Sequence, residues 1–176
     1  KFELDGLFEP TWSPDGQKIA VAGIKDGWSD IYVVDINDES LTRVTHDPYD
    51  ERHLDWSPDG QWIAMSSDRP DTSLTFTAGK DFPFGQYDIF VIQADGSELR
   101  RVVADEVAEE SHPVWGPDSK QLAFVSDRTG MGNIFIANLD SAGVYPITNL
   151  LSGAQYLDWS TDGRKIVFNA FHKGAL

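Results

Sequence analysis

The chain has 176 residues, no cysteine and a formal net charge of −15 at pH 7, and 40% of its residues are hydrophobic. This composition is that of a globular domain, and the lack of cysteine excludes disulfides and thiolate metal sites. The acidic balance argues against nucleic acid or an anionic membrane as partner, because phosphate binding needs clustered Lys and Arg. With no apolar run near 18 residues, membrane insertion is not expected either, and a basic partner or a cation fits the charge better.

The chain repeats one short pattern four times. A tryptophan is followed each time by Ser-Pro-Asp-Gly or a close variant, and these tryptophans are Trp12, Trp56, Trp115 and Trp159. Ser and Asp offer side-chain oxygens, Pro presets φ and Gly tolerates positive φ, so the tetrapeptide predicts a tight turn. The intervals are 44, 59 and 44 residues. A period of about 40–45 residues with strand-like patterns predicts β-propeller blades, the second with an insertion of roughly 15 residues.

Each unit predicts four strands in chain order. The first ends at the tryptophan, and short apolar runs predict the second strand at 19–22, 63–66, 122–125 and 166–168. β-branched and aromatic residues predict the third strand at 31–34, 89–92 and 134–136, and the fourth lies near 43–45, 101–103 and 146–148. We therefore expect an all-β, partial β-propeller of four-stranded antiparallel blades, with no helix longer than a turn or two.

The predicted blades span residues 5–46, 47–104, 105–149 and 150–176, the last with two strands only, and residues 1–4 form a strand of a preceding blade. An open arc leaves unpaired strand edges, so three arrangements are possible. The chain is a fragment of a longer propeller, or residues 1–4 close a small four-bladed ring, or two copies complete one another as a symmetric homo-oligomer.

Further motifs resemble those of the TolB-type propeller repeat. Ser67-Asp68-Arg69 and Ser126-Asp127-Arg128 match its middle element, and Asp30-Ile31-Tyr32 and Asp88-Ile89-Phe90 match a later one. Repeats of this type occur in TolB of the bacterial cell envelope, in propellers of prolyl-oligopeptidase-like peptidases, in oligogalacturonate lyases and in large envelope proteins. The resemblance implies a propeller fold and a periplasmic or extracellular location, and leaves these functions open.

One candidate site lies at the mouth of the central channel. The residues three positions before the tryptophans are Glu9, His53, His112 and Tyr156. In the lyases that this array resembles, histidines near the starts of inner strands hold a divalent metal. Neutral His and Glu are competent ligands for Zn or Mn, so Glu9, His53 and His112 form a candidate metal site. No other cofactor is expected.

A second candidate site lies on the loops of the same face. The insertion, roughly residues 70–86, contains three aromatic residues that either pack down as a lid or anchor a partner. The neighbouring loops are acidic, which favours a basic partner or Ca²⁺. The predicted binding residues are Phe76, Phe82, Phe84, Asp50, Glu51, Glu109 and Glu110.

No catalytic motif is present in these residues. The chain lacks a Gly-x-Ser-x-Gly elbow, a His-Glu-x-x-His pattern and a glycine-rich phosphate loop. We therefore predict a noncatalytic, TolB-like module that binds a protein or peptide in an envelope or secreted bacterial protein. The alternatives are the gating propeller of a prolyl-oligopeptidase-like peptidase, whose catalytic domain lies outside these residues, and a metal-dependent, lyase-like propeller.

Overall fold

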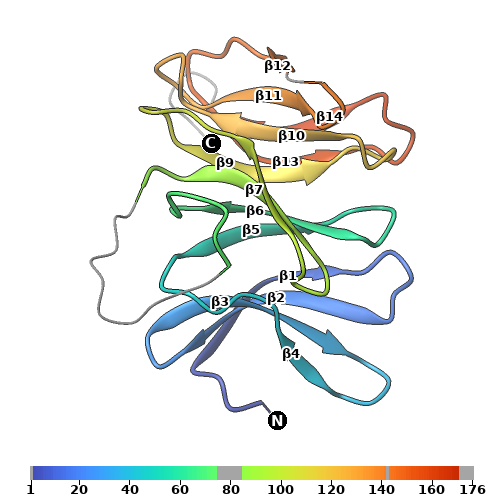
Figure 1. The fold of residues 1–176 in the computed structure, drawn as a ribbon. Coiled ribbons are helices and arrows are strands. Elements are labelled where there is room, and N and C mark those ends of the chain that lie inside the picture. Colours follow the sequence, from blue (N-terminus) through green and yellow to red (C-terminus); the bar gives the residue numbers. More distant parts are fainter. Residues whose placement is uncertain (1, 75–84, 142, 171–176) are drawn as a thin grey trace.

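A computed structural model describes residues 2–74, 85–141 and 143–170. In these residues the chain forms fourteen β-strands and no helix, and no segment there could cross a membrane as an apolar helix. The strands form three four-stranded sheets and one two-stranded sheet, with antiparallel neighbours throughout. In Figure 1 the first three sheets follow one another in chain order from the N-terminus, and the two-stranded sheet overlaps the third in this view. The prediction of an all-β, partial propeller is confirmed.

Each sheet is one blade whose strands run in sequence order. Blade 1 contains β1 (Gly6–Trp12), β2 (Lys18–Lys25), β3 (Trp28–Asp35) and β4 (Leu41–Arg43). Blade 2 contains β5 (Glu51–Trp56), β6 (Trp62–Ser67), β7 (Asp88–Gln93) and β8 (Leu99–Val103). Blade 3 contains β9 (Glu110–Trp115), β10 (Gln121–Ser126), β11 (Asn133–Asn138) and β12 (Gly143–Pro146). Blade 4 contains β13 (Ala154–Trp159) and β14 (Ile166–Ala170).

The last strand of blade 3 lies earlier than the sequence pattern indicates. We predicted it near residues 146–148, but β12 ends at Pro146. The Thr148 hydroxyl accepts a hydrogen bond from the Ile134 N–H at 2.9 Å. A side-chain oxygen therefore replaces the strand ladder at this point, and the same bond joins the Ile31 N–H to the Thr45 hydroxyl at 2.8 Å in blade 1.

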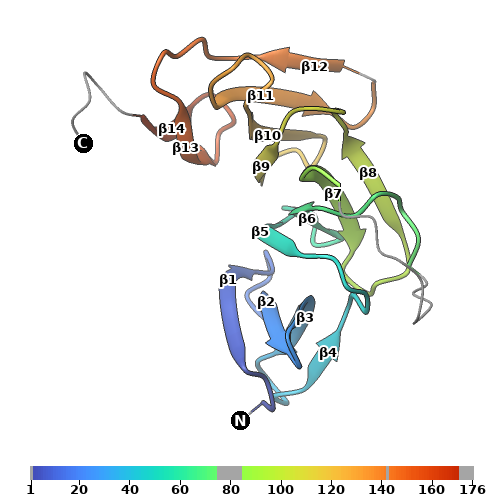
Figure 2. The ribbon, with the colours of Figure 1, turned by 90° about the vertical axis from the view of Figure 1, so that its left-hand side faces the viewer.

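The blades form an open arc rather than a closed ring (Figure 2). Blades 1 and 4 lie at its two ends, and β14 pairs only with β13 within the described strands. Residues 2–4 form no strand, so the small four-bladed ring that they would close is wrong. Their assignment to a preceding blade stays a prediction.

The repeated tetrapeptide forms the predicted turn between the first two strands of each blade. In blade 1 the Ser13 hydroxyl donates to Asp15 at 2.6 Å and accepts the Lys18 N–H at 2.8 Å, while the Gly16 N–H donates to the Ser13 carbonyl at 2.9 Å. Gly16 has a φ of 67°, and Ser119 adopts the equivalent left-handed conformation at 57°. Ser119 therefore tolerates a conformation that favours glycine, and the turn survives the substitution.

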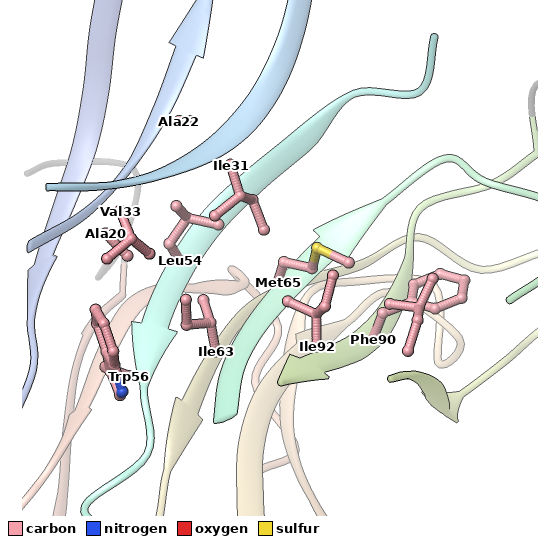
Figure 3. Packing of buried hydrophobic residues seen from close by; sticks show 11 residues of the cluster. Ala20, Ala22, Ile31, Val33, Leu54, Trp56, Ile63, Met65, Phe90 and Ile92 are labelled. Carbon is pink, nitrogen blue, oxygen red and sulfur yellow. The ribbon is translucent and has the colours of Figure 1, made fainter. Parts of the chain in front are cut away.

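The tryptophans that end the inner strands of blades 2 and 3 pack against the preceding blade. Trp56 is 6% exposed and shares a cluster with Ala20 and Val33 of blade 1 (Figure 3). Trp115 is 4% exposed and belongs to the cluster that contains Ala64 of blade 2. Trp12, at the same position in blade 1, is instead 57% exposed. It lies on the outer blade of the arc, where the described residues provide no preceding blade to cover it.

Candidate functional site

A strained bulge recurs in the inner strand of every blade. The pairing of the first and second strands shifts in all four sheets near the residue three positions before the tryptophan. That residue has positive φ each time, at 51° for Glu9, 55° for His53, 52° for His112 and 49° for Tyr156. Non-glycine residues rarely adopt this conformation, and a bulge re-aims its side chain. The repeat therefore directs one side chain from each blade to the same place.

These four side chains form a continuous row across the blades, which we call the channel mouth. The rings of His53 and His112 stack with centroids 3.7 Å apart and planes 27° apart. Tyr156 meets His112 edge-on at 5.0 Å. The Glu9 carboxylate accepts the backbone N–H of His53. The row thus presents one carboxylate, two imidazoles and one phenol to the same space.

A pocket of about 490 Å³ opens at this row. Leu54, Pro113 and Leu157 supply apolar wall, and Asp55 and Asp158 add two carboxylates that the sequence analysis did not single out. Asp55 accepts the Trp115 N–H at 2.7 Å, which links blade 2 to blade 3. Burial, reinforced by the charge of Asp158, raises the pKa of Asp55 to about 7.

The two histidines are neutral at neutral pH. Burial, with a smaller contribution from His53, lowers the pKa of His112 to about 4. Burial likewise lowers the pKa of His53, whose Nδ1 lies 2.8 Å from the Ser66 hydroxyl. The Nδ1 of His112 is buried and has no hydrogen-bond partner within the part of the chain that the structure describes.

The structure brings the candidate metal ligands Glu9, His53 and His112 together, but not as a coordination sphere. An imidazole lone pair lies in the plane of its ring, so the stacked rings of His53 and His112 hold their lone pairs in two separate, nearly parallel planes, whereas metal ligands must converge on one point. No group of three His, Asp or Glu side chains among residues 2–74, 85–141 and 143–170 is placed to hold a metal ion. The arrangement suits an aromatic or hydrogen-bonding ligand better than an ion.

Two of the predicted binding residues are structural. Glu51 and Glu110 are fully buried, and each pairs with the arginine of a Ser-Asp-Arg motif, Arg69 and Arg128 respectively. Burial raises the pKa of both carboxyls, that of Glu51 strongly. Each glutamate precedes its arginine by 18 residues, a repeated opposite-charge spacing that could have revealed the pairs. They join the first strand of a blade to the end of its second strand and face no partner.

The remaining predicted residues fall into two groups. Asp50 and Glu109 lie in the loops that directly precede β5 and β9. Asp50 pairs with Arg52 and accepts the Tyr87 hydroxyl at 2.8 Å, and Glu109 is exposed and accepts the Tyr87 N–H at 3.0 Å. Phe76, Phe82 and Phe84 lie outside the described residues.

Antiparallel blades in an arc, joined at an inner row of bulged residues, define the chain as a β-propeller module. The TolB beta propeller domain model matches residues 5–80 and 69–176, and the chain belongs to this family. An uncharacterized protein of Agrobacterium fabrum is 28% identical over 168 residues, which cover 89% of this chain and 52% of that protein. The Tol-Pal system protein TolB of Francisella tularensis is 26% identical over 163 residues, covering 90% of this chain and 34% of the relative. The chain therefore spans a third to a half of these relatives.

Solved structures share the fold. TolB from Acinetobacter baumannii superposes with a TM-score of 0.78 at 22% identity, over 97% of this chain and 39% of that protein. A putative TolB from Agrobacterium tumefaciens gives 0.75 at 26% identity, over 97% and 61% of the two chains. A puromycin hydrolase mutant gives 0.71 at 15% identity, over 96% and 25%. Propellers of TolB and of a hydrolase thus share this blade geometry.

Proposed function

We propose that this propeller is a noncatalytic module that binds a protein or peptide across the channel mouth. The observation that carries the proposal is the fourfold bulge, which places Glu9, His53, His112 and Tyr156 on one pocket. Left-handed φ at a non-glycine residue costs energy, and such strain clusters at functional sites. Tyr156 is 65% exposed, although a large aromatic ring gains free energy when it is buried.

The chemistry of the pocket favours a polypeptide ligand. Its wall is apolar at Leu54, Pro113 and Leu157, while carboxylates and imidazoles stand around it. Central apolar and aromatic contacts surrounded by polar groups are typical of protein-binding hot spots. The net charge of −15 favours a partner segment that carries positive charge.

We propose a location in the bacterial envelope or outside the cell. The support is the similarity to the Tol-Pal system protein TolB of Francisella tularensis. The gating propeller of a peptidase is the second candidate, supported by the fold shared with puromycin hydrolase. A hydrolase domain in the parent sequence would favour that candidate, whereas the stacked imidazoles oppose a lyase-like metal centre.

Site-specific photocrosslinking tests the proposal. A photoreactive amino acid replaces Tyr156 in the parent protein, and a matched variant carries it at Lys120, an exposed residue between β9 and β10 on the opposite face. We expect discrete protein adducts from position 156 after irradiation of producing cells, and none of these from position 120. Equal adducts at both positions, or none at position 156, would contradict the proposal.

A further inference from the structure

A second pocket, of about 330 Å³, lies between blades 3 and 4 beside the channel mouth. His112 forms part of the wall of both pockets. The second pocket is lined by the carboxylates of Glu109 and Asp127, and by Ser111, Gly132 and Gly153. These small residues leave the space open, and their counterparts one blade earlier show what would fill it.

The junction between blades 2 and 3 has the same backbone as the junction between blades 3 and 4. The Glu110 N–H donates to the Tyr87 carbonyl at 2.7 Å, and the Ala154 N–H donates to the Gly132 carbonyl at 2.7 Å. Both acceptors directly precede the third strand of their blade, and both donors lie five residues before a tryptophan. The side chains of the two junctions can therefore be compared position by position.

Blade 2 carries large side chains where blade 3 carries small ones. Four residues before the tryptophan, Arg52 corresponds to Ser111, and directly before the third strand, Tyr87 corresponds to Gly132. Arg52 pairs with Asp50, and its guanidinium carbon lies 4.9 Å from the centroid of the Tyr87 ring. At the blade 2 junction the chain thus supplies its own cation to its own carboxylate.

Blade 3 keeps the acidic residues of blade 2 although it lacks the arginine. Asp50 corresponds to Glu109, and Asp68 corresponds to Asp127. Asp68 accepts the backbone N–H of Asp50 at 2.9 Å, and Asp127 accepts the backbone N–H of Glu109 at the same distance. Yet neither Glu109 nor Asp127 forms an ion pair with any described residue.

The pocket is also kept open by its backbone. A Cβ atom on Gly132 would lie 3.1 Å from Val125 Cγ1 and 3.2 Å from the Ala154 carbonyl oxygen. The second contact is with backbone, so a side chain at this position would require the neighbouring blade to shift by a few tenths of an ångström. Gly153 has a φ of 79°, a conformation that favours glycine over any residue that would fill the pocket.

We propose that this pocket binds the guanidinium of an arginine from the partner polypeptide, in the role that Arg52 fills within blade 2. The inference deepens the proposed function and rests on it. A guanidinium is planar and can donate several hydrogen bonds to two carboxylates at once. Glu109 and Asp127 accept these bonds, and Val125 and Met131 line the path of the aliphatic stem.

Titration with a small probe tests the pocket without the partner. N-acetyl-arginine amide is added to the isotope-labelled chain, and the amide resonances of Gly132 and Gly153 are followed by NMR. The uncharged isostere N-acetyl-citrulline amide is the matched ligand control. We expect saturable shifts at both glycines with the arginine derivative, and affinity at least about tenfold weaker with the citrulline derivative, the loss expected for one charge-assisted hydrogen bond.

Three variants distinguish arginine binding in this pocket from a general attraction of arginine to the acidic surface. Glu109→Gln removes one proposed ligand and should weaken arginine binding about tenfold. Glu106→Gln removes the same charge from an exposed residue of the same loop outside the pocket, and should change affinity little. Ser111→Arg supplies an internal guanidinium as in blade 2 and should abolish binding. Unchanged far-UV circular dichroism confirms that each variant is folded.

Equal binding of the two derivatives, or equal losses in Glu106→Gln and Glu109→Gln, would overturn the arginine pocket. Crosslinking at position 156 distinguishes this failure from failure of the proposed function. If adducts persist while the pocket does not discriminate arginine from citrulline, only the pocket assignment is wrong. If the adducts are absent while the pocket binds arginine selectively, the channel-mouth function is wrong and the pocket itself stands.

Discussion

Replacing Trp56 with alanine should destabilise the propeller strongly. A buried tryptophan side chain removes about 150–250 Å² from water, which is worth about 4–6 kcal/mol at 25 cal/mol per Å². The Trp56 Nε1 is buried without a hydrogen-bond partner among the described residues, so its removal returns about 1–3 kcal/mol of desolvation cost. The cavity left between blades 1 and 2 adds to the loss. We expect a net cost of about 3–5 kcal/mol.

The chain contains its own control for this prediction. Trp12 occupies the same position in its repeat but is 57% exposed, against 6% for Trp56. Trp12→Ala should therefore cost less than about 1 kcal/mol, as for most exposed sites. Trp56→Phe keeps most of the apolar surface and removes the unpartnered N–H, so it should cost less than about 1.5 kcal/mol.

Equilibrium unfolding in urea, followed by far-UV circular dichroism, measures these differences without depending on tryptophan fluorescence. The free energies of unfolding are compared only between variants that have the same m-value, because equal m-values indicate that unfolding exposes the same surface area. A cost below about 1 kcal/mol for Trp56→Ala, or equal costs for Trp56→Ala and Trp12→Ala, would refute the reasoning that the inner tryptophan binds one blade to the preceding one.

Three further predictions concern buried charge and pH. Arg69→Met should cost about 3–5 kcal/mol in urea unfolding because it strands the buried carboxylates of Glu51 and Asp47. Adding Glu51→Leu should restore only part of that loss, because Asp47 stays buried without its cation; a single variant as stable as the parent would contradict this. The folded-state pKa of Asp55, about 7, exceeds its usual value, so the folded state loses stability as pH rises from about 4 to 7 and this buried carboxyl ionises. Asp55→Asn should accordingly raise the Tm more at pH 8 than at pH 4, and an equal change at both values would refute it. The folded-state pKa of His112, about 4, lies below its usual value, so stability is lost as pH falls from about 6.5 to 4. His112→Phe should flatten that part of the Tm profile, and an unaltered acid slope would count against the burial of this ring.

Repetition made the blades predictable from the sequence. The tryptophan and the turn after it recur in every unit, so a chance match is excluded and the strand order follows from the turns. Repetition could not predict the exposure of Trp12, because the burial of a tryptophan depends on the neighbouring blade rather than on the residue itself. Residue type alone does not distinguish Trp12 from Trp56.

The site was only partly predictable for a related reason. Sequence spacing placed Glu9, His53, His112 and Tyr156 together, but the positive φ that re-aims them depends on strand register, which residue type does not encode. The density of carboxylates in these loops placed Glu51 and Glu110 among the predicted binding residues. Glu51 and Glu110 instead lie buried against arginines that are distant in sequence. The pocket between blades 3 and 4 emerges only when structurally equivalent positions are compared.

Hydrogen–deuterium exchange of the parent protein, with and without the partner captured at position 156, shows which segments the partner covers. We expect slower exchange in the inner-strand segments around His53, His112 and Tyr156 when the partner is bound, with unchanged exchange in the turns around Gly16, Gly60 and Ser119 on the opposite face. Protection confined to those turns, with the inner strands unaffected, would show that the partner binds elsewhere and that the channel mouth is not the binding site.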